Sequence, residues 1–374
     1  MRALGIAVLV GVLAAVIIAL PNAGAFPPPA HSEPAPAVFT MTNAVAGNQV
    51  IEYERAANGA LTYVAEYATG GSGTGVSLAD QGGLALTSDN HWLLVVDAGS
   101  NQVSVFRVGG YGGAPWLALS DVASSGGVLP VSIAISGNTV YVLNDGNSTV
   151  PGNIAGFHLA SSGKLDPISG SEQALSTSAA TAAAQVSFNP AGTLLVVTEK
   201  NTNLIDVYAV DWNGKSHPVG PDPSQGSTPY GFAFTPHGQL VVSEAASGSL
   251  SSYDVGAHGY WNVVSSSVPD YQVAPCWVVI TPGGGYAYTS DGHSGNISSY
   301  TVGWGGQLTL LESSAAVTGA GPTDMSLASN GHLLYVYDAG AGEIQGFVVH
   351  SNGSLTLVDT TGGLPATAEG LAAV

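Results

Sequence analysis

The stretch LLVVDAGSNQVSVFRV, residues Leu93–Val108, is the unit that this chain repeats. Two runs rich in Val and Leu flank Ala98-Gly99-Ser100-Asn101, which has the composition of a tight turn. The stretch therefore predicts a strand, a polar turn and a second strand. With this stretch included, the sequence holds seven copies. The other six are Phe39–Tyr53, Val140–Leu159, Leu194–Val210, Leu240–Val255, Tyr286–Val302 and Leu333–Val349.

Each copy is the middle part of a longer repeat. Another short apolar strand and a turn containing Gly, Pro or Asn precede it, and a fourth strand follows it. Four short strands per repeat, without helical periodicity, predict a small antiparallel sheet. The first strands are spaced by about one β-propeller blade. They begin at Gly83, Ser132, Gln185, Gly231, Trp277 and Asp324.

The two ends of the chain supply the parts of one further repeat. Leu371–Val374 has the pattern of a first strand with nothing after it, whereas Val38–Asn43 resembles a second strand with no first strand before it. Pairing these segments completes a blade and removes the free sheet edges. We therefore predict an all-β fold over residues 38–374. It is a seven-bladed β-propeller of four-stranded antiparallel blades, closed by pairing of the N- and C-terminal strands.

The segment before the repeats has the pattern of a targeting signal. Arg2 precedes an apolar run from Ala3 to Leu20, and Ala23-Gly24-Ala25 matches a cleavage site. Residues 1–25 are thus predicted to be a secretory signal peptide, and residues 26–37 a Pro/Ala-rich tether. We expect a secreted protein, extracellular or periplasmic, with no membrane attachment after cleavage. An uncleaved membrane anchor is the alternative, because the run is long enough to span a bilayer.

The composition is strongly acidic. Six Lys and Arg residues stand against 25 Asp and Glu, a formal net charge of −19. Such a surface repels nucleic acid and anionic lipid, so neither is expected as a partner. Few ion pairs can be lost on acidification, which favours tolerance of mildly acidic surroundings. Cys276 is the single cysteine, so stability must come from core burial and ring closure. We expect a monomer.

Short phrases within the repeats resemble those of a known family. Phe39–Asn43 and the VDAGSNQV phrase at Val96–Val103 resemble YVTN-type repeats, and the Pro-x-Gly turns resemble those of lactonase-like seven-bladed propellers. That family includes bacterial 6-phosphogluconolactonases and fungal carboxymuconate-cyclizing enzymes. The resemblance covers nearly all of residues 38–374. It implies the same fold, and only weakly an activity, because many members have no known reaction.

Polar residues recur where the second strands end. They are Asn43, Asp97, Asn144, Glu199, Glu244, Asp291 and Asp338. One interpretation is that each side chain caps the following turn. The other is that several carboxylates face one central channel and repel one another unless a cation binds. Oxygen ligands suit Ca²⁺, with Asp97, Asp291 and Asp338 as the predicted metal ligands.

The resemblance implies a pair of catalytic groups at the channel mouth. Family members place a His or Arg after the Pro that precedes a first strand, and a Glu at the end of a second strand. Glu199 and Glu244 match the Glu position. The residues after the prolines are Val131, Tyr230, Cys276 and Thr323, so the basic partner is missing. Without a basic clamp, a phosphorylated lactone is a poor candidate substrate, and a neutral lactone is less strongly excluded.

Further residues near the predicted mouth complete the candidate site. His293 lies in a loop close to Asp291 and is a candidate general base, although a solvated turn His is the commoner situation. Lys200 adjoins Glu199, which suggests a solvated ion pair in a turn. Four residues near the starts of first strands are predicted either to bind substrate or to fill the channel. They are Gln185, Tyr230, Trp277 and Asp324.

Two functions follow from these patterns. The first is a secreted lactonase-like hydrolase of a neutral lactone or related ester, with Glu199, Glu244 and His293 as catalytic residues and Ca²⁺ assistance in one version. The second is a non-catalytic extracellular binding or scaffold propeller. In both, the expected partner is a small molecule, a lactone or a carbohydrate-like ligand. The missing basic partner favours the second function, and the family resemblance favours the first.

Overall fold

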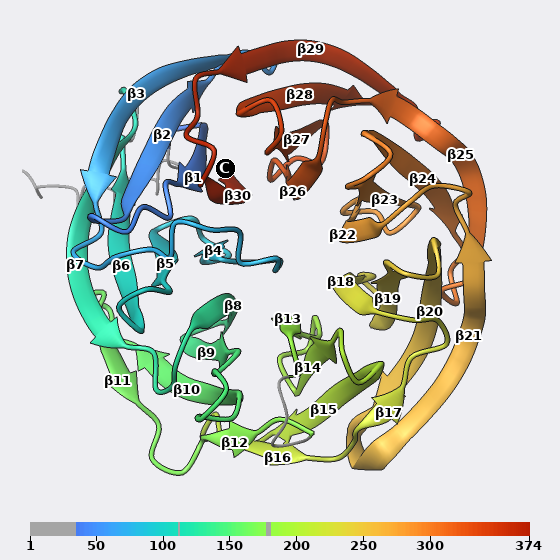
Figure 1. The fold of residues 1–374 in the computed structure, drawn as a ribbon, viewed down its shortest axis with the longest axis horizontal. Helices are drawn as coiled ribbons and strands as arrows, with labels where there is room; N and C mark the ends of the chain where they lie inside the picture. Colours follow the sequence, from blue (N-terminus) through green and yellow to red (C-terminus); the bar gives the residue numbers. More distant parts are fainter. Residues whose placement is uncertain (1–34, 111–112, 177–180) are drawn as a thin grey trace, which may run out of the picture. The chain divides into compact units, whose positions relative to one another are not determined.

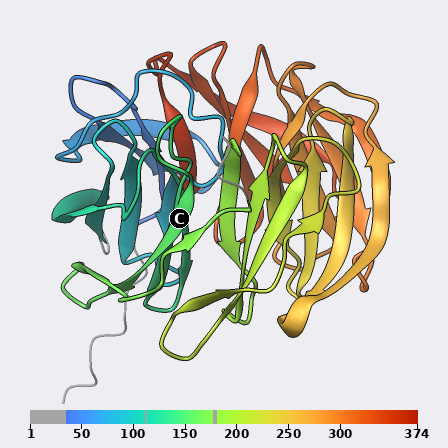
Figure 2. The same cartoon turned by 60° about the horizontal axis from the view of Figure 1, so that its bottom comes forward.

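The computed structural model describes residues 35–110, 113–176 and 181–374, and these form a ring of seven antiparallel sheets around a central axis (Figure 1; Figure 2). The predicted seven-bladed propeller is thus confirmed. The predicted signal peptide and most of the predicted tether lie outside the described residues. Ala35 is buried and the first strand begins at Ala37, so the last residues of that tether belong to the propeller. No helix in the described part of the chain is long and apolar enough to cross a membrane.

The blades are numbered around the ring, with strands given from the axis outward. Blade 1 contains β30 (Glu369–Ala373), β1 (Ala37–Met41), β2 (Gln49–Arg55) and β3 (Leu61–Ala68). Blade 2 contains β4 (Leu84–Leu86), β5 (Trp92–Asp97), β6 (Gln102–Gly109) and β7 (Trp116–Ser124). Blade 3 contains β8 (Pro130–Ser136), β9 (Thr139–Asn144), β10 (Asn153–Leu159), β11 (Leu165–Pro167) and β12 (Gln173–Ala174). In this blade the two last strands both pair with β10, so the fourth strand is interrupted.

The remaining blades follow the same order. Blade 4 contains β13 (Ala183–Phe188), β14 (Leu194–Glu199), β15 (Leu204–Val210), β16 (Ser216–Pro218) and β17 (Asp222–Pro223). Blade 5 contains β18 (Pro229–Phe234), β19 (Gln239–Glu244), β20 (Ser249–Gly256) and β21 (Tyr260–Pro269), with the short 3₁₀ helix η1 (Ala257–Gly259) before β21. Blade 6 contains β22 (Pro275–Ile280), β23 (Tyr286–Asp291), β24 (Asn296–Val302) and β25 (Leu308–Val317). Blade 7 contains β26 (Pro322–Leu327), β27 (Leu333–Asp338), β28 (Glu343–Val349) and β29 (Leu355–Gly362).

The ring closes by pairing of the two terminal strands, as predicted. The innermost strand of blade 1 is β30 from the C-terminus, and it runs antiparallel to β1 (Figure 1). The Arg55 guanidinium also binds the last residue, since its Nε and Nη2 atoms donate to the Val374 carbonyl at 3.2 and 2.9 Å. Closure leaves no inner sheet edge open to solvent or to another chain.

The second strand of each blade forms the core. It is covered by neighbouring strands on both edges and by adjacent blades on both faces, which explains its continuous apolar sequence. All six residues of β14 and of β27 are buried. We call the face on which the chain passes between blades the mouth face. The lower face carries the first hairpins and the outer turns, which join third to fourth strands.

Adjacent blades are joined by a repeated contact between a tyrosine and a glycine turn. Tyr141, Tyr288 and Tyr335 each occupy the third position of a second strand. Each hydroxyl donates to a glycine carbonyl in the outer turn of the following blade. The acceptors are Gly214 at 2.7 Å, Gly353 at 2.9 Å and Gly59 at 2.8 Å. We call this arrangement the interblade clamp.

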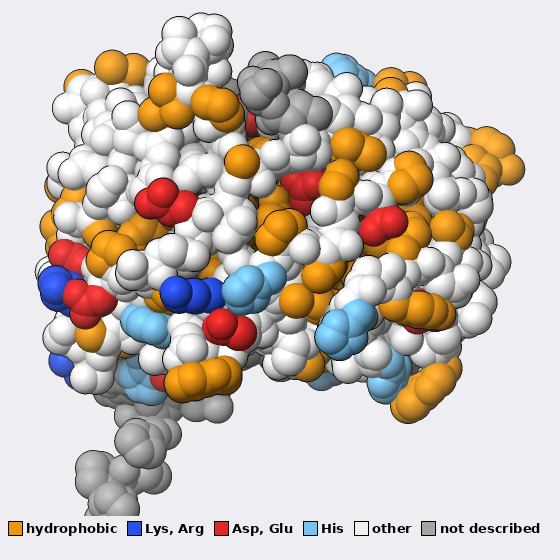
Figure 3. Space-filling view, turned by 90° about the horizontal axis from the view of Figure 1, so that it is seen from below, with side chains coloured by type: hydrophobic (Ala, Val, Ile, Leu, Met, Phe, Trp, Pro, Cys, Tyr) orange, Lys and Arg blue, Asp and Glu red, His pale blue; other side chains and the backbone are white. Residues whose placement is uncertain are grey.

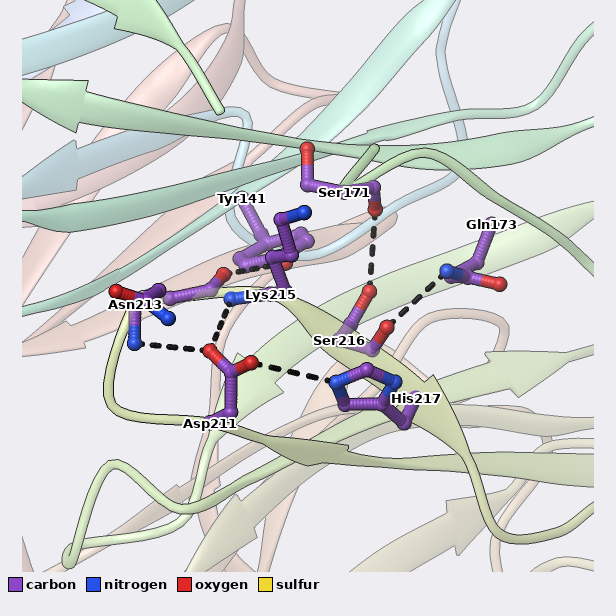
Figure 4. A network of polar contacts seen from close by, with 9 residues as sticks. Tyr141, Ser171, Gln173, Asp211, Asn213, Lys215, Ser216 and His217 are labelled. Carbon is purple, nitrogen blue, oxygen red and sulfur yellow. Dashed lines mark hydrogen bonds and ion pairs between the residues drawn. The ribbon is translucent and has the colours of Figure 1, made fainter. Parts of the chain in front are cut away.

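The outer turn of blade 4 shows how the clamp is shaped (Figure 4). The Asp211 carboxylate accepts the backbone N–H groups of Asn213 at 2.8 Å and Lys215 at 3.0 Å, which fixes the turn around Gly214. The other carboxylate oxygen lies 3.4 Å from Nε2 of His217. The turn is thereby held in the conformation that presents its carbonyl to Tyr141.

Glycine is required at the clamp for two separate reasons. Gly353 has φ +82°, a left-handed conformation that side chains disfavour. A Cβ atom at this position would also lie 2.5 Å from the Tyr286 ring. Gly238 provides a useful comparison, because it has φ +94° but no atom within 4 Å of a Cβ. The two positions thus separate backbone strain from the steric contact between blades.

We predict that removing one clamp weakens the fold. Tyr288→Phe loses a buried hydrogen bond and should lower the free energy of unfolding by about 1 kcal/mol. Gly353→Ala adds backbone strain of roughly 1–3 kcal/mol and a clash with blade 6. Urea unfolding measures both. Gly238→Ala is the control and should cost less than Gly353→Ala. Equal costs at the two glycines would show that the interblade contact contributes nothing.

The carboxylates at the ends of the second strands hold the linkers between blades. Asp97 accepts hydrogen bonds from Thr69 and Ser104, both at 2.6 Å, and Thr69 lies just before the linker from blade 1 to blade 2. Glu244 accepts from the Gly226 N–H at 2.7 Å, in the linker from blade 4 to blade 5. These two side chains thus bind the linkers between blades, and not the turns that follow their strands as the capping interpretation expects.

Two of these carboxylates have a second acid beside them. The Asp206 carboxyl on β15 contacts Glu199, and burial followed by the charge of Glu199 raises the pKa of Asp206 to about 8. Asp291 contacts Asp270, and burial raises the pKa of Asp291 to about 8, with Asp270 adding to the shift. Burial also raises the pKa of Glu52 to about 7. The folded protein therefore keeps these protons at pH values where the unfolded chain has released them.

We predict that the protein is more stable at pH 5 than at pH 9. The unfolded chain releases these protons near pH 4, and the folded chain only near pH 7–8. The contribution of these groups to the free energy of unfolding is therefore full below about pH 4 and is lost as the pH rises through about 8. Thermal unfolding at pH 5, 7 and 9 measures the trend, and a melting temperature that rises with pH would contradict it.

A double variant links this trend to the two pairs. Asp206→Asn combined with Asp291→Asn removes two titrating groups, each of which contributes at most about 1.4 kcal/mol per pH unit. The pH dependence should therefore flatten. Asp166→Asn is the control, because Asp166 is exposed and paired with Lys164. An unchanged slope in the double variant would assign the pH dependence to other groups.

Candidate functional site

A segment of the chain crosses the centre of the ring on the mouth face. Residues 78–82, which we call the axial plug, lie between β3 and β4, and the chain before β4 reaches the axis in Figure 1. The Gln81 N–H donates to the Ala184 carbonyl at 3.0 Å, and the Ser132 hydroxyl donates to the Gln81 carbonyl at 2.6 Å. The plug thus contacts blades 3 and 4, although it leads into blade 2.

The side chain of Gln81 fixes the plug to blade 6 as well. Its Nε2 donates to the Val278 carbonyl at 2.8 Å, and its Oε1 accepts the Val278 N–H at 3.0 Å. The amide therefore pairs with one backbone residue in the manner of a β-ladder. Strand β4 has only three residues, because the chain before it is diverted to the axis.

Ionisable side chains of four different segments surround the plug. Asp80 belongs to the plug itself, Asp324 to β26, Glu369 to β30, and Lys200 follows β14. Asp80, Asp324 and Glu369 are only 2%, 3% and 4% exposed. The Lys200 ammonium donates to the Ala79 carbonyl and lies 4.7 Å from the centre of the Tyr230 ring. We call these four residues the axial cluster.

Each carboxyl of the cluster has an incomplete set of partners. The Gly370 N–H donates to Asp324 Oδ2 at 3.0 Å, and the Leu78 N–H donates to Glu369 Oε1 at 3.1 Å. Asp80 Oδ2 is buried and accepts no hydrogen bond from the described residues. A buried carboxylate without a donor is costly, so Asp80 favours its protonated form.

The pKa values of the cluster follow from burial and from like charge. Burial raises the pKa of Glu369 to about 7, although nearby N–H and O–H donors and Lys200 oppose the shift. Burial, then the charges of Glu369 and Asp324, raise the pKa of Asp80 well above its ordinary value. Burial lowers the pKa of Lys200, against the attraction of Asp80 and other acids. The cluster thus holds an ammonium and a carboxyl with a pKa near neutral, both bound to the plug.

The four residues predicted to bind substrate come together around the plug. The Trp277 Nε1 donates to the Asp80 carbonyl, and the rings of Trp277 and Tyr230 lie 5.2 Å apart. Gln185 accepts the Phe232 N–H at 2.6 Å, and Asp324 is part of the axial cluster. All four are buried, so in this conformation they fill the channel and support the plug.

The predicted catalytic residues lie elsewhere. Glu199 is buried and accepts the Ser176 N–H at 2.9 Å, within the linker network of the second-strand ends, as Glu244 does. His293 lies exposed in the turn after Asp291. The structure therefore does not bring these three side chains together. The predicted solvated ion pair between Lys200 and Glu199 is wrong, because Lys200 extends to the axis and Glu199 into the blade.

The predicted calcium ligands do not share one site. Asp97, Asp291 and Asp338 end second strands of three different blades, and Asp97 and Asp291 each accept a serine hydroxyl of their own blade. In the part of the chain that the structure describes, no group of three or more His, Cys, Asp or Glu residues is placed to hold a metal ion. Asp97, Asp291 and Asp338 thus do not fit a shared calcium ion.

Sequence reasoning missed Asp80 and the role of Lys200. Asp80 lies in a linker that has no counterpart in the other repeats, so the repeat pattern does not predict its place. Glu369 does carry a signal in the sequence, because it lies just before Gly370 and Leu371–Val374, the segment that has the pattern of a first strand. The position of Lys200 depends on a side-chain direction that strand spacing does not determine.

Comparison with known proteins supports the fold. The family model described as "Lactonase, 7-bladed beta-propeller" matches residues 84–259. Among the curated proteins, none matches the chain.

Several solved structures resemble the chain at low sequence identity. A proposed 6-phosphogluconolactonase from Bacteroides uniformis has a TM-score of 0.71 at 15% identity, covering 91% of this chain and 100% of that one. The periplasmic gluconolactonase PpgL of Pseudomonas aeruginosa has a TM-score of 0.66 at 16% identity, covering 91% and 99%. Virginiamycin B lyase from Staphylococcus aureus has a TM-score of 0.51 at 15% identity, covering 76% and 85%.

At these identities the neighbours establish the fold and no activity. The family match runs from blade 2 to the short 3₁₀ helix of blade 5, and the structural likeness covers nearly all of the described residues. Together with the seven observed blades, they confirm the resemblance read from the repeats. The chain is a seven-bladed β-propeller that is similar to the lactonase-like propellers.

Proposed function

We propose that this propeller hydrolyses a neutral lactone or related ester at the axial cluster. The observation that carries the proposal is that Lys200 and Glu369 both bind the axial plug, at the Ala79 carbonyl and the Leu78 N–H, and that burial raises the pKa of the Glu369 carboxyl to about 7. A carboxyl that titrates near the working pH suits general base catalysis. An ammonium in a buried site suits stabilisation of a developing oxyanion. Secretion, inferred from the predicted signal peptide, is part of the same proposal.

The reaction assigns one task to each group. Ionised Glu369 accepts a proton from water, and the resulting hydroxide attacks the carbonyl carbon of the lactone. The Lys200 ammonium donates a hydrogen bond to the carbonyl oxygen as negative charge develops there. When the tetrahedral intermediate collapses, the bond from the carbonyl carbon to the ring oxygen breaks. Protonated Glu369 returns its proton to that oxygen, and the product is a hydroxy acid.

The charge of the cluster favours a neutral substrate. Lys200 is the single cation of the cluster, and ionised Glu369 balances its charge when it acts as the base, so a phosphate group near the axis would meet no net positive charge. Among the structural neighbours, the Pseudomonas aeruginosa protein is described as a gluconolactonase and the Bacteroides uniformis protein as a proposed 6-phosphogluconolactonase, so their descriptions do not decide between the two substrates. The charge of the cluster agrees with the sequence, in which the missing basic clamp makes a phosphorylated lactone a poor candidate substrate.

Access to the carboxyls requires the plug to move. Lys200 is half-buried, whereas Asp80 within the plug and Asp324 and Glu369 around it are buried. A substrate therefore reaches the ammonium first. The same coverage favours the second candidate function, a non-catalytic binding propeller whose filled channel only supports the fold. Activity measurements distinguish the two functions.

We predict that two substitutions in the cluster abolish most lactone hydrolysis. Lys200→Met removes the donor to the oxyanion and should lower kcat about 10²–10³-fold. Glu369→Gln removes the general base and should lower kcat about 10²–10⁴-fold. A panel of neutral lactones tests both, with circular dichroism to check folding. No turnover by the wild type would favour the binding propeller.

Glu244→Gln is the matched control. Glu244 is a buried glutamate like Glu369, but it bonds to a linker and lies outside the cluster. Its substitution should leave the hydrolysis rate close to that of the wild type. If Glu244→Gln abolishes activity and Glu369→Gln does not, the site lies at the second-strand ends and our assignment is wrong.

We also predict a pH profile set by Glu369. The base must be ionised, so kcat/KM should be low below pH 6 and rise through about pH 7. This rise should be absent from the residual activity of Glu369→Gln. A rate that is constant from pH 5 to 8 in the wild type would exclude a group of this pKa as the base.

A further inference from the structure

The lower face carries shallow grooves at equivalent places between blades. Each forms where the outer-turn region of one blade meets the first hairpin of the blade before it. The grooves between blades 2 and 3, 4 and 5, and 6 and 7 have volumes of about 250, 320 and 250 Å³. The first continues outward into a second hollow of about 500 Å³, which shares Asp89, Trp92 and Ser161 with it. Histidines and a few basic side chains gather along this lower edge in Figure 3.

Two residues distinguish the groove between blades 2 and 3. Trp92 begins the second strand of blade 2 and pairs across the sheet with Arg107 on the third strand. The same pair of positions occurs in every blade, so the repeat supplies its own comparison. The other pairs are Val38 and Tyr53, Thr139 and His158, Leu194 and Ala209, Gln239 and Asp254, Tyr286 and Thr301, and Leu333 and Val348. Only blade 2 joins an indole to a guanidinium.

Neither side chain is explained by a contact within the protein. Arg107 is exposed and makes no hydrogen bond or ion pair with any other residue that the structure describes. Trp92 is half-buried, and its edge lies against the turn of blade 3, since a Cβ on Gly163 would come within 2.4 Å of the indole. The turn therefore holds the indole in place beside the groove.

The acid in the groove is already occupied. Asp89 accepts the Thr87 hydroxyl at 2.6 Å and the His91 N–H at 3.1 Å, and its other oxygen lies 3.0 Å from the His91 ring. The remaining polar groups are hydroxyls from both blades. They come from Ser120, Ser161 and Ser162. The groove thus offers an unpaired guanidinium, an aromatic wall and several hydroxyls.

We propose that this groove binds an acidic sugar, that is, a hydroxylated ring or chain bearing one carboxylate. A guanidinium binds a carboxylate through two parallel hydrogen bonds. An indole contacts the apolar face of a sugar, and the serine hydroxyls match its hydroxyl groups. A single free cation beside Asp89 suits a monoanion better than a phosphate dianion. The site lies on the face opposite the axial cluster and does not depend on the proposed hydrolysis.

The protein's overall charge makes such binding selective. With a formal net charge of −19, the protein repels anions in general, so attraction at this groove must come from local contacts.

The ligand has two possible sources with the same chemistry. One is a free sugar acid, such as the hydroxy acid that a lactone yields, and the other is a uronate unit of an acidic polysaccharide.

Isothermal titration calorimetry of the folded propeller with four probes tests the proposal. Galacturonate should bind at least about tenfold more tightly than galactose, because only the acid can form a charge-assisted pair with Arg107. Gluconate and trigalacturonate distinguish the sources: the tighter of the two identifies a free acid or a polysaccharide. No binding of any of the three acids by the wild type would overturn the proposal.

Matched variants assign the binding to the groove. Arg107→Gln should weaken acid binding about tenfold or more and leave the fold intact, because Arg107 is exposed. Lys215→Gln is the control, since Lys215 is a cation of another outer turn and lines none of these grooves. Equal affinity in Arg107→Gln and wild type, or equal loss in both variants, would overturn the proposal.

Discussion

Close packing between neighbouring blades, which the interblade clamp fixes at three of the seven junctions, is the constraint on which the ring depends. A blade of four strands cannot bury both faces of its second strand by itself, so neighbouring blades must lie close along their whole length. The tyrosine hydroxyl reaches that neighbour only if the outer turn has no side chain in the way. Glycine therefore serves the packing of blades as much as the shape of the turn, as at Gly353, where a Cβ would meet the Tyr286 ring.

The clamp also explains why the centre of the molecule is polar. Blades held at a fixed spacing leave an axial space that no regular strand fills. The plug fills it with a backbone segment, whose carbonyl and N–H groups need partners from several blades. Gln81, Trp277 and Lys200 supply those partners. The carboxyls that accompany them become buried, and their raised pKa values follow from this packing.

The repeat predicts the fold well because each blade obeys the same rule. Strand order, ring closure and the apolar second strands can all be read from the copies of LLVVDAGSNQVSVFRV. The candidate site could be predicted only in part. Tyr230 and Trp277 were placed at the axis by their position in the repeat. Glu199 ends a strand as predicted, but whether its carboxylate faces the channel or the linker depends on which N–H group needs an acceptor.

Departures from the repeat are therefore the most informative positions in this chain. Where a residue follows the repeat, the fold accounts for it, as the linker bonds of Asp97 and Glu244 show. Asp80 has no equivalent in other blades, and the pairing of Trp92 with Arg107 occurs in only one of seven. The fold does not require an indole and a guanidinium at that pair, because the other blades form the same strands with different residues. An exposed exception such as Arg107 leaves the stability of the fold unchanged, whereas a buried one such as Asp80 lowers it. The buried Asp80 therefore points more strongly to a function than the exposed Arg107 does.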